Sequence, residues 1–241
     1  MRSILVLGFL ALFLVAGIPV HCLLLLIGKF NLKLRYKIAN FLVYWGFRFE
    51  LFLSGAKIEV KGTENIPKEP VLFVANHRSY FDILVIHTTS TKRPGFVAKK
   101  DMEKMPLLSS WMKNICCLFL DREDIRSGVQ MIKDGVGRIK NGYSMVIYPE
   151  GHRSRTKDML PFKEGSLKIA EKAGCAVVPV TLIGMDQLLE VRPGFNIQPA
   201  RVKVIYGEPV YLNELPKEQK KKAGAYVQSI IAENIKRETG R

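Results

Sequence analysis

The chain of 241 residues has room for one full domain and an appendage, which excludes two large domains. Apolar residues make up 48% of it and charged residues 24%, so a wholly disordered chain is also excluded. It carries 37 Lys and Arg against 22 Asp and Glu, a formal net charge of +15, which favours a partner with phosphate groups or an anionic surface. The four cysteines form no Cys-x-x-Cys pair, so the sequence predicts neither a zinc site nor a disulfide framework.

An uncharged segment, Ser3–Ile27, lies close to the N-terminus. Because 20 of its 25 residues are apolar, a helix here is long enough to cross a hydrocarbon core about 30 Å thick. Pro19 would kink such a helix, and a kinked helix could dip into one leaflet instead. A secretory signal peptide is the alternative, but its apolar region is usually only about 7–15 residues long, and no Ala-x-Ala site follows here. We therefore expect a retained membrane segment.

A second apolar run, Ile38–Leu53, follows three basic residues. It contains six aromatic side chains beside Arg48 and Glu50, a mixture that favours a helix at the level of the lipid headgroups. A core helix of the globular domain is the alternative, because periodicity alone does not separate the two. The excess of Lys and Arg after the first run predicts that the rest of the chain lies on the cytoplasmic face of the cell membrane. Residues 1–55 are thus predicted to be membrane-associated helices.

The remaining residues, 56–241, alternate short apolar runs with amphipathic segments. This order is typical of an α/β domain in which helices flank a mostly parallel sheet. Strands are expected at Lys57–Lys61, Val71–Ala75, Gly95–Ala98, Cys116–Leu120, Met145–Tyr148, Val177–Leu182 and Arg201–Tyr206. Helices are expected at Tyr80–His87, Pro106–Lys113, Ile125–Lys140, Gly165–Ala173 and Pro216–Lys236. In such sheets functional residues gather in the loops that follow the carboxyl ends of the strands.

Three of these loops are rich in polar residues. They are residues 76–82 after the second strand, 121–122 after the fourth and 149–155 after the fifth. Parallel strands bring such loops to one edge of the sheet. There a histidine, several carboxylates and several arginines would form a catalytic site for an anionic substrate.

The first loop pairs His77 with Asp82. Ser79 and Asp82 have the spacing of a capping box, which predicts a helix that starts at Ser79 with Asp82 in its first turn. From there the Asp82 carboxylate can accept a hydrogen bond from one imidazole nitrogen of His77, which leaves the other nitrogen free to act as a base. The alternative is that Asp82 only caps the helix and His77 is an ordinary loop residue.

Four motifs and one accompanying segment, Phe162–Gly165, carry a resemblance to a known family. In chain order they are Asn76-His77-x4-Asp82, Leu118–Arg122, Tyr148–Ser154, Phe162–Gly165 and Val177–Val180. Together they resemble the motifs of the glycerolipid acyltransferases, and most closely the bacterial 1-acyl-sn-glycerol-3-phosphate (lysophosphatidic acid) acyltransferases, over roughly residues 56–210. Two positions depart from the usual pattern, since Tyr148 replaces Phe and His152 replaces Thr. We interpret His152 as a tolerated substitution and not as the base, because no Asp lies at the matching spacing.

The resemblance implies the glycerolipid acyltransferase fold and an acyltransferase activity. The expected reaction moves a fatty acyl group from acyl-CoA or acyl carrier protein to the sn-2 hydroxyl of 1-acyl-glycerol 3-phosphate (lysophosphatidic acid). It gives phosphatidic acid for phospholipid biosynthesis. His77, oriented by Asp82, would act as the base, and backbone N–H groups near the helix start would stabilise the oxyanion. Neither a metal nor a cofactor is expected.

Other residues in or near the motifs are expected to bind substrate. Arg122 and Arg153 would hold the phosphate, because a guanidinium fork matches phosphate oxygens and stays charged. Lys99, at a further strand end, is a third cation. Glu150 and Gly151 are expected to shape the substrate loop. For each cation the alternative is a solvated basic face.

Other functions stay open. The acceptor could be another lysophospholipid or glycerol 3-phosphate, or the protein could bind membrane lipid without catalysis. Neither a Gly-x-Ser-x-Gly elbow nor a P-loop motif occurs, which argues against a serine hydrolase and a nucleotide-dependent enzyme. The membrane-like N-terminus argues against a nucleic-acid partner. Near the C-terminus, Lys217 and residues 220–222 form a basic segment that either contacts anionic lipid or is solvated.

Overall fold

A seven-stranded sheet with the strand order β1-β7-β6-β2-β5-β3-β4 forms the centre of the computed structural model, which describes residues 1–156 and 158–240. The strands are β1 (Lys57–Lys61), β2 (Leu72–Ala75), β3 (Gly95–Lys99), β4 (Leu118–Leu120), β5 (Met145–Ile147), β6 (Val177–Ile183) and β7 (Arg201–Tyr206). Strands β2 to β6 are parallel, whereas β7 runs antiparallel to β6 and pairs parallel with β1. The prediction of a mostly parallel sheet is confirmed, and each strand lies within two residues of its predicted bounds.

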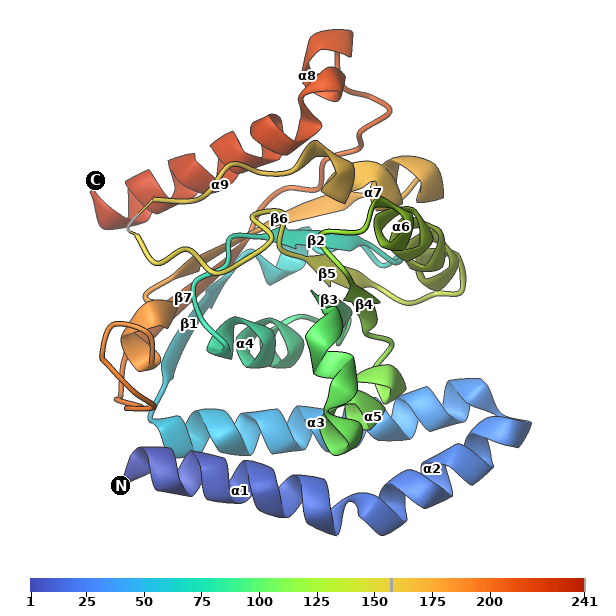
Figure 1. Cartoon of the computed structure of the whole chain (residues 1–241). Helices are drawn as coiled ribbons and strands as arrows, with labels where there is room; N and C mark the ends of the chain where they lie inside the picture. Colours follow the sequence, from blue (N-terminus) through green and yellow to red (C-terminus); the bar gives the residue numbers. More distant parts are fainter. Residues whose placement is uncertain (157, 241) are drawn as a thin grey trace.

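Helices cover both faces of this sheet (Figure 1). One face carries α4 (Phe81–Thr89) and α5 (Pro106–Asn114), and the other carries α6 (Ile125–Lys140), α7 (Lys168–Ala173) and α9 (Ala223–Thr239). Successive side chains of β2 alternate between the two cores, so Phe73 packs on the α4 side and Leu72 on the α6 side. Because both faces are covered, the central strands are continuous apolar runs without polar positions.

Two predicted helices near the C-terminal half are shorter than expected. The segment predicted as one helix from Gly165 to Ala173 begins as a 3-10 turn, Glu164–Leu167, and becomes α7 only afterwards. The segment predicted from Pro216 to Lys236 is broken at Lys222 into α8 (Lys217–Lys221) and α9.

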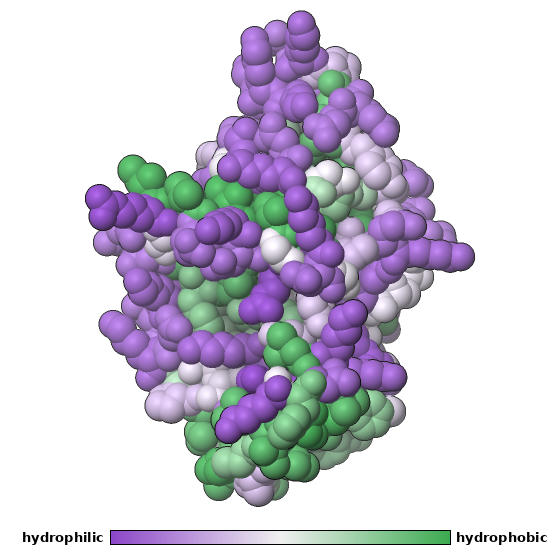
Figure 2. Space-filling model, turned by 90° about the vertical axis from the view of Figure 1, so that its right-hand side faces the viewer, coloured by the Kyte–Doolittle hydropathy of each residue, from purple (hydrophilic) through white to green (hydrophobic). Residues whose placement is uncertain are grey.

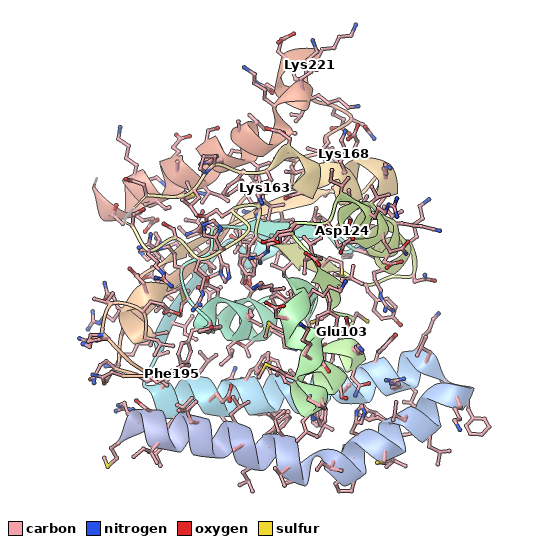
Figure 3. All side chains as sticks on the ribbon, viewed as in Figure 1. Glu103, Asp124, Lys163, Lys168, Phe195 and Lys221 are labelled. Carbon is pink, nitrogen blue, oxygen red and sulfur yellow. The ribbon has the colours of Figure 1, made fainter. Side chains whose placement is uncertain are left out.

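The lysines of α8 lie far from the apolar N-terminal helices. The helix projects from the end of the molecule opposite α1 (Arg2–Ala16) and α2 (Ile18–Phe30), and Lys221 lies near its tip (Figures 1 and 3). One flat membrane surface therefore does not meet both ends of the molecule. This geometry favours the solvated alternative for the basic C-terminal segment.

The continuous helix predicted over Ser3–Ile27 is wrong, and the predicted kink is confirmed. The chain bends by 48° between α1 and α2 at Gly17. Pro19 falls in the first turn of α2, where its missing N–H leaves no bond unmade. A Cβ on Gly17 would lie 2.8 Å from the Trp111 ring of α5, so the bend is packed tightly against the domain. Within the described residues no single helix is long and apolar enough to cross a membrane. The bent pair α1 and α2 together has the length and the apolar composition that a crossing needs.

The third helix, α3 (Leu32–Ser54), has two different faces. It starts six residues before the predicted Ile38, because the Asn31 side chain caps it by accepting a hydrogen bond from Leu34 N at 2.9 Å. Its buried face, with Val43 and Leu51, joins the core beneath the sheet. The aromatic side chains on another face are exposed, namely Phe41, Trp45, Phe49 and Phe52. The core alternative thus holds for one face of this helix, whereas its position at the lipid headgroups and the division of the chain at residue 55 stay predictions.

Candidate active site

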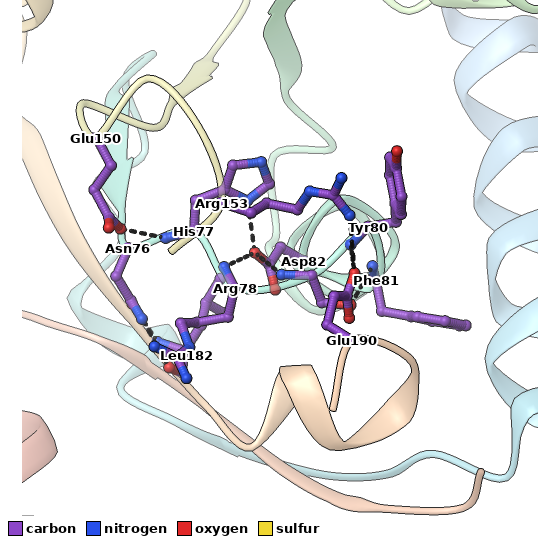
Figure 4. A network of polar contacts seen from close by, with 11 residues as sticks. Asn76, His77, Arg78, Tyr80, Phe81, Asp82, Glu150, Arg153, Leu182 and Glu190 are labelled. Carbon is purple, nitrogen blue, oxygen red and sulfur yellow. Dashed lines mark hydrogen bonds and ion pairs between the residues drawn. The ribbon is translucent and has the colours of Figure 1, made fainter. Parts of the chain in front are cut away.

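His77 and Asp82 meet at the carboxyl end of β2 (Figure 4). The Nδ1 atom of His77 lies 2.7 Å from Asp82 Oδ2, which confirms the predicted contact. The same oxygen accepts the backbone N–H groups of Arg78 at 2.7 Å and Ser79 at 2.9 Å. Asp82 therefore both caps the turn and holds the imidazole. The helix begins at Phe81 and not at Ser79 as predicted, because Ser79 forms a tight turn in which its Oγ accepts Phe81 N.

The imidazole of His77 is fixed on a second side by an aromatic ring. Tyr148 stacks on it with ring centroids 4.0 Å apart and an angle of 18° between the planes. Since Asp82 accepts from Nδ1, the hydrogen-bonding pattern assigns the proton to Nδ1, and no group within the described residues binds Nε2. The tautomer and the ring plane are thus set, with a nitrogen lone pair left over. Burial raises the pKa of Tyr148 well above its ordinary value, so its phenol stays neutral.

The backbone N–H groups of residues 77 to 82, around the start of α4, are all occupied. Those of His77 and Tyr80 donate to the carboxylates of two glutamates, and those of residues 78 and 79 donate to Asp82. The N–H groups of Phe81 and Asp82 bind Ser79. The loop uses these six N–H groups to fix its own shape, so none of them is free to bind an oxyanion, and an oxyanion role for N–H groups near this helix start stays a prediction.

Glu150 joins the first polar loop to the third. Its Oε1 accepts His77 N at 2.7 Å and its Oε2 accepts Leu160 N at 2.8 Å, and the side chain is buried. Gly151 follows with φ +81°, a left-handed conformation that a side chain would strain. The two residues determine the path of this loop, which a bond from Ser154 N to His77 O at 2.9 Å also holds against the first loop.

Arg153 reaches from the third loop to the start of α4. Its guanidinium lies 3.6 Å from the centroid of the Tyr80 ring, and its Nη1 donates to Glu190 Oε1 at 3.0 Å. The same oxygen accepts Tyr80 N at 3.0 Å. Burial raises the pKa of Glu190. The carboxylate and the ring together fix one edge and one face of the guanidinium, which leaves its remaining N–H groups for a ligand.

Sequence reasoning missed Glu190 and the partner of Arg78. Arg78 Nη2 donates to Asp186 Oδ2 at 2.8 Å, so the two arginines near His77 each pair with a carboxylate from the segment after β6. Neither Asp186 nor Glu190 belongs to a motif. Each lies more than 30 residues from its arginine in the sequence, so no spacing predicts the pairing. Asn76 is a further case, because its side chain exchanges two hydrogen bonds with the backbone of Leu182, at 2.9 and 2.8 Å.

Lys99 and Arg122 lie on the same edge of the sheet but apart from this cluster. Lys99 ends β3 and Arg122 follows β4, and these strands stand two and three positions away from β2, about 10 and 14 Å at the usual strand spacing. Both side chains are exposed, and Lys99 pairs with Asp101. Within the described residues no hydrogen bond or ion pair connects either one to His77. The structure thus brings together His77, Asp82, Glu150, Gly151 and Arg153, and leaves these two cations at a distance.

Another histidine, His152, lies between Gly151 and Arg153 in the same loop. His152 is exposed. In the part of the chain that the structure describes, no group of three or more His, Cys, Asp or Glu side chains is placed to hold a metal ion.

Comparison with known proteins adds independent information. Residues 57–183, more than half of the chain, match the model of a protein family described as acyltransferase. The chain is 33% identical over 150 residues to a 1-acyl-sn-glycerol-3-phosphate acyltransferase of Borreliella burgdorferi, a match that covers 62% of this chain and 60% of that protein. It is 32% identical over 157 residues to a chloroplast 1-acyl-sn-glycerol-3-phosphate acyltransferase of Brassica napus, a match that covers 64% of this chain and 45% of that protein. The matches thus span roughly half to two thirds of the length of such curated relatives.

A solved structure has the same fold. The crystal structure of the 1-acyl-sn-glycerophosphate (LPA) acyltransferase from Thermotoga maritima matches with a TM-score of 0.79, covering 100% of this chain and 98% of that chain at 22% identity. The likeness therefore extends over the N-terminal helices as well as the sheet.

Proposed function

Because the chain belongs to the acyltransferase family that includes the 1-acyl-sn-glycerol-3-phosphate acyltransferases, we propose that it acylates lysophosphatidic acid. The reaction transfers a fatty acyl group from acyl-CoA or acyl carrier protein to the sn-2 hydroxyl and gives phosphatidic acid. The observation that carries this proposal is the 2.7 Å contact between His77 Nδ1 and Asp82 Oδ2, which leaves Nε2 as a free base.

The chemistry needs one base and no covalent enzyme intermediate. His77 Nε2 takes the proton from the sn-2 hydroxyl while the oxygen attacks the thioester carbonyl and forms a new C–O bond. The tetrahedral intermediate collapses, the C–S bond breaks, and the leaving thiolate takes the proton back from the imidazolium. Asp82 stabilises the transient positive charge on the ring and keeps Nδ1 protonated throughout.

The oxyanion of the intermediate needs donors outside the helix start. We assign this role to the backbone N–H groups of His152 and Arg153, which bind no acceptor within the described residues. They follow Gly151 in the loop that is bonded to His77. Preorganised N–H donors of this kind typically contribute about 3 kcal/mol each to transition-state stabilisation.

We assign the acceptor's phosphate first to Arg153. Of the three proposed cations, only Arg153 contacts the loop that carries His77, because its guanidinium stacks on Tyr80. Its free N–H groups match phosphate oxygens. Lys99 and Arg122 are assigned to the same phosphate, which requires Lys99 to exchange its partner Asp101 for the ligand. Their effect on binding is therefore expected to be smaller than that of Arg153.

We also propose that α1, α2 and α3 associate with the cytoplasmic face of a membrane, which would give the active site access to a lipid substrate. Large apolar side chains are exposed along all three helices, including Ile4, Leu12, Val15, Leu23, Leu26, Phe30, Phe41, Trp45 and Phe52. Figure 2 shows the end of this helical layer that faces the viewer as a hydrophobic base with hydrophilic side chains above it. Exposed apolar area of this extent is typical of a membrane or partner surface.

The test is a transfer assay with product identification. Purified full-length protein is supplied with acyl-CoA or acyl carrier protein and with lysophosphatidic acid, glycerol 3-phosphate, a lysophosphodiester or monoacylglycerol, and products are identified by mass. We expect phosphatidic acid from lysophosphatidic acid and its absence with His77→Ala, whereas Lys133→Ala, on the exposed side of α6, keeps activity. Binding of lipid without any product from either donor would support a non-catalytic lipid-binding protein instead.

A further inference from the structure

A second basic site lies at the opposite edge of the sheet from His77. A cavity of about 410 Å³ opens there between the amino-terminal half of α3, the segment before β3 and the segment before β5. Four cations line it, Lys33, Lys37, Lys92 and Arg93. We propose that this cavity binds a phosphate-bearing anion, separately from the active site.

One face of α3 forms the floor of the cavity. Lys33, Tyr36, Lys37 and Asn40 line it with the spacing i, i+3, i+4 and i+7, which places them in one row on the helix. Gly95 lines the opposite wall at the amino end of β3. Because Lys99 ends the same strand at the catalytic edge, the length of β3, about 13 Å, separates the two regions.

The charge in this cavity is of one sign. No carboxylate is among the lining residues that the structure describes. Glu69 lies close enough to raise the pKa of Lys92, but burial has the larger effect and lowers it. Like charges around one concavity repel each other and focus a positive potential, so the arrangement costs stability unless an anion occupies it.

One buried polar atom without a partner lies in this cavity, and two more lie in the neighbouring segment. Among the described residues, six buried side-chain atoms lack a hydrogen-bond partner, and Asp82, Tyr148 and Glu190 carry three of them in the catalytic region. The other three are Asn40 Oδ1, His87 Nε2 and Ser90 Oγ. Asn40 lines the cavity, and residues 87 and 90 belong to the end of α4 and the loop that supplies Lys92 and Arg93. Of these three atoms only the Ser90 hydroxyl can donate to an anion, so the proposal rests on the cations and hydroxyls that line the cavity.

Hydroxyl donors complete a set suited to phosphate oxygens. Tyr36 OH accepts Arg138 Nη1 at 3.0 Å, and Ser144 Oγ accepts Val71 N at 3.1 Å. Each hydroxyl accepts one bond in this way and keeps its own proton to donate. Both residues line the cavity. Ammonium, guanidinium and hydroxyl donors together match the several acceptor oxygens of a phosphate.

The position of the cavity suits the headgroup of a phospholipid. Its α3 wall belongs to the layer whose outer side chains are apolar, and Figure 2 shows hydrophilic side chains directly above that base at this end of the molecule. A phosphate at the surface of a membrane would lie at this height if α1 and α2 enter the apolar region. Free inorganic phosphate has the same chemistry and is the other source to be tested.

Calorimetric titration of the full-length protein in neutral detergent micelles tests the proposal. The two probes are dihexanoyl phosphatidic acid and inorganic phosphate. We expect two binding sites for the lipid. The double variant Lys33→Gln/Lys37→Gln should weaken one of them at least about tenfold, because it removes two charge-assisted bonds from exposed positions of a helix. Arg153→Ala should weaken the other site only, so a failure of the proposed function would leave the first result unchanged.

Lys217→Gln/Lys221→Gln is the matched control, with the same change of charge on the exposed helix α8. It should leave both sites intact, and equal melting temperatures show that all variants fold. Tighter binding of the lipid than of inorganic phosphate at the α3 site identifies a headgroup, and equal affinity identifies free phosphate. The proposal is overturned if the Lys33/Lys37 variant binds like wild type, or if the α8 control loses as much.

Discussion

The two edges of the sheet hold their positive charges in different ways. At the carboxyl edge, Arg78 pairs with Asp186 and Arg153 pairs with Glu190, and each guanidinium has one fixed orientation. At the amino edge, four cations surround a cavity without a carboxylate among the lining residues described. Paired charges are costly to move and suit a site that must position a reacting group, whereas unpaired charges attract a ligand without orienting it. We therefore expect substitutions at the carboxyl edge to change turnover or acceptor choice, and changes at the amino edge to alter binding or stability.

The largest effect is expected from Asp82→Asn. The amide would present N–H to Nδ1 of His77, which favours the wrong tautomer and removes the charge that stabilises the imidazolium. We expect kcat to fall by at least about 10²-fold and up to about 10⁴-fold with the fold intact. Steady-state kinetics and a melting curve measure both, with Asp134→Asn on the exposed side of α6 as the control. If Asp82→Asn turned over substrate at close to the wild-type rate, the carboxyl edge would not be the catalytic edge of the sheet.

Arg153→Ala sharpens the comparison through acceptor choice. If Arg153 binds the phosphate, its loss should lower kcat/KM for lysophosphatidic acid by about 10²-fold and change that for monoacylglycerol little. Arg155→Ala is the control, because it removes an exposed arginine from the same loop. The measurement is kcat/KM with both acceptors for wild type and both variants. Equal losses on the two acceptors would show that Arg153 supports the fold of the loop and not the phosphate.

At the amino edge the expected effect is on stability. Burial lowers the pKa of His87 to about 4, and the group is enclosed by Phe47 of α3, Phe96 of β3 and the carbonyl of Pro94, with Arg93 nearby. Its folded-state pKa lies below the unfolded value near 6.5, so the unfolded state binds a proton first as the pH falls. The contribution of neutral His87 to the free energy of unfolding should therefore be full above about pH 6.5. It should fall by about 3 kcal/mol between pH 6.5 and 4.

The melting temperature measured between pH 4.5 and 7.5 checks this expectation. His87→Gln should flatten the curve in that window, whereas His152→Gln, which removes an exposed histidine, should leave it as in wild type. The same slope in wild type and His87→Gln would assign the acid sensitivity to another group.

The smallest effect is expected from Glu190→Gln. The amide oxygen can still accept Arg153 and Tyr80, but a neutral acceptor binds a guanidinium about half as strongly as a carboxylate does. We expect KM for lysophosphatidic acid to rise roughly fivefold to tenfold, with kcat unchanged and monoacylglycerol unaffected. A decrease in KM would instead mean that Glu190 competes with the phosphate for Arg153.

Much of this molecule could be read from the sequence, and the remainder has a common cause. The strands and the contact of His77 with Asp82 depend on runs and spacings within a few residues, which local chemistry determines. The bend at Gly17 was expected only as a kink near Pro19, because its exact place depends on Trp111, almost 100 residues away. Glu190 could not be found, since its partners approach it only through the order of strands in the sheet. The cavity beside residues 33–40 could not be predicted either, because its other walls come from the distant segments 92–95 and 141–144.

The side chain of Asn76 has a consequence for the way heat inactivates the protein. Its two bonds to the backbone of Leu182 continue the pairing of β2 with β6 by one more step, directly before His77. The catalytic loop is in this sense the last rung of the sheet and not a flap attached to it. Such a loop does not melt ahead of the strands, because it opens only when the ladder beside it opens. Loss of turnover and loss of secondary structure should then follow one cooperative transition, and the amide of Leu182 should exchange its hydrogen as slowly as those of the central strands.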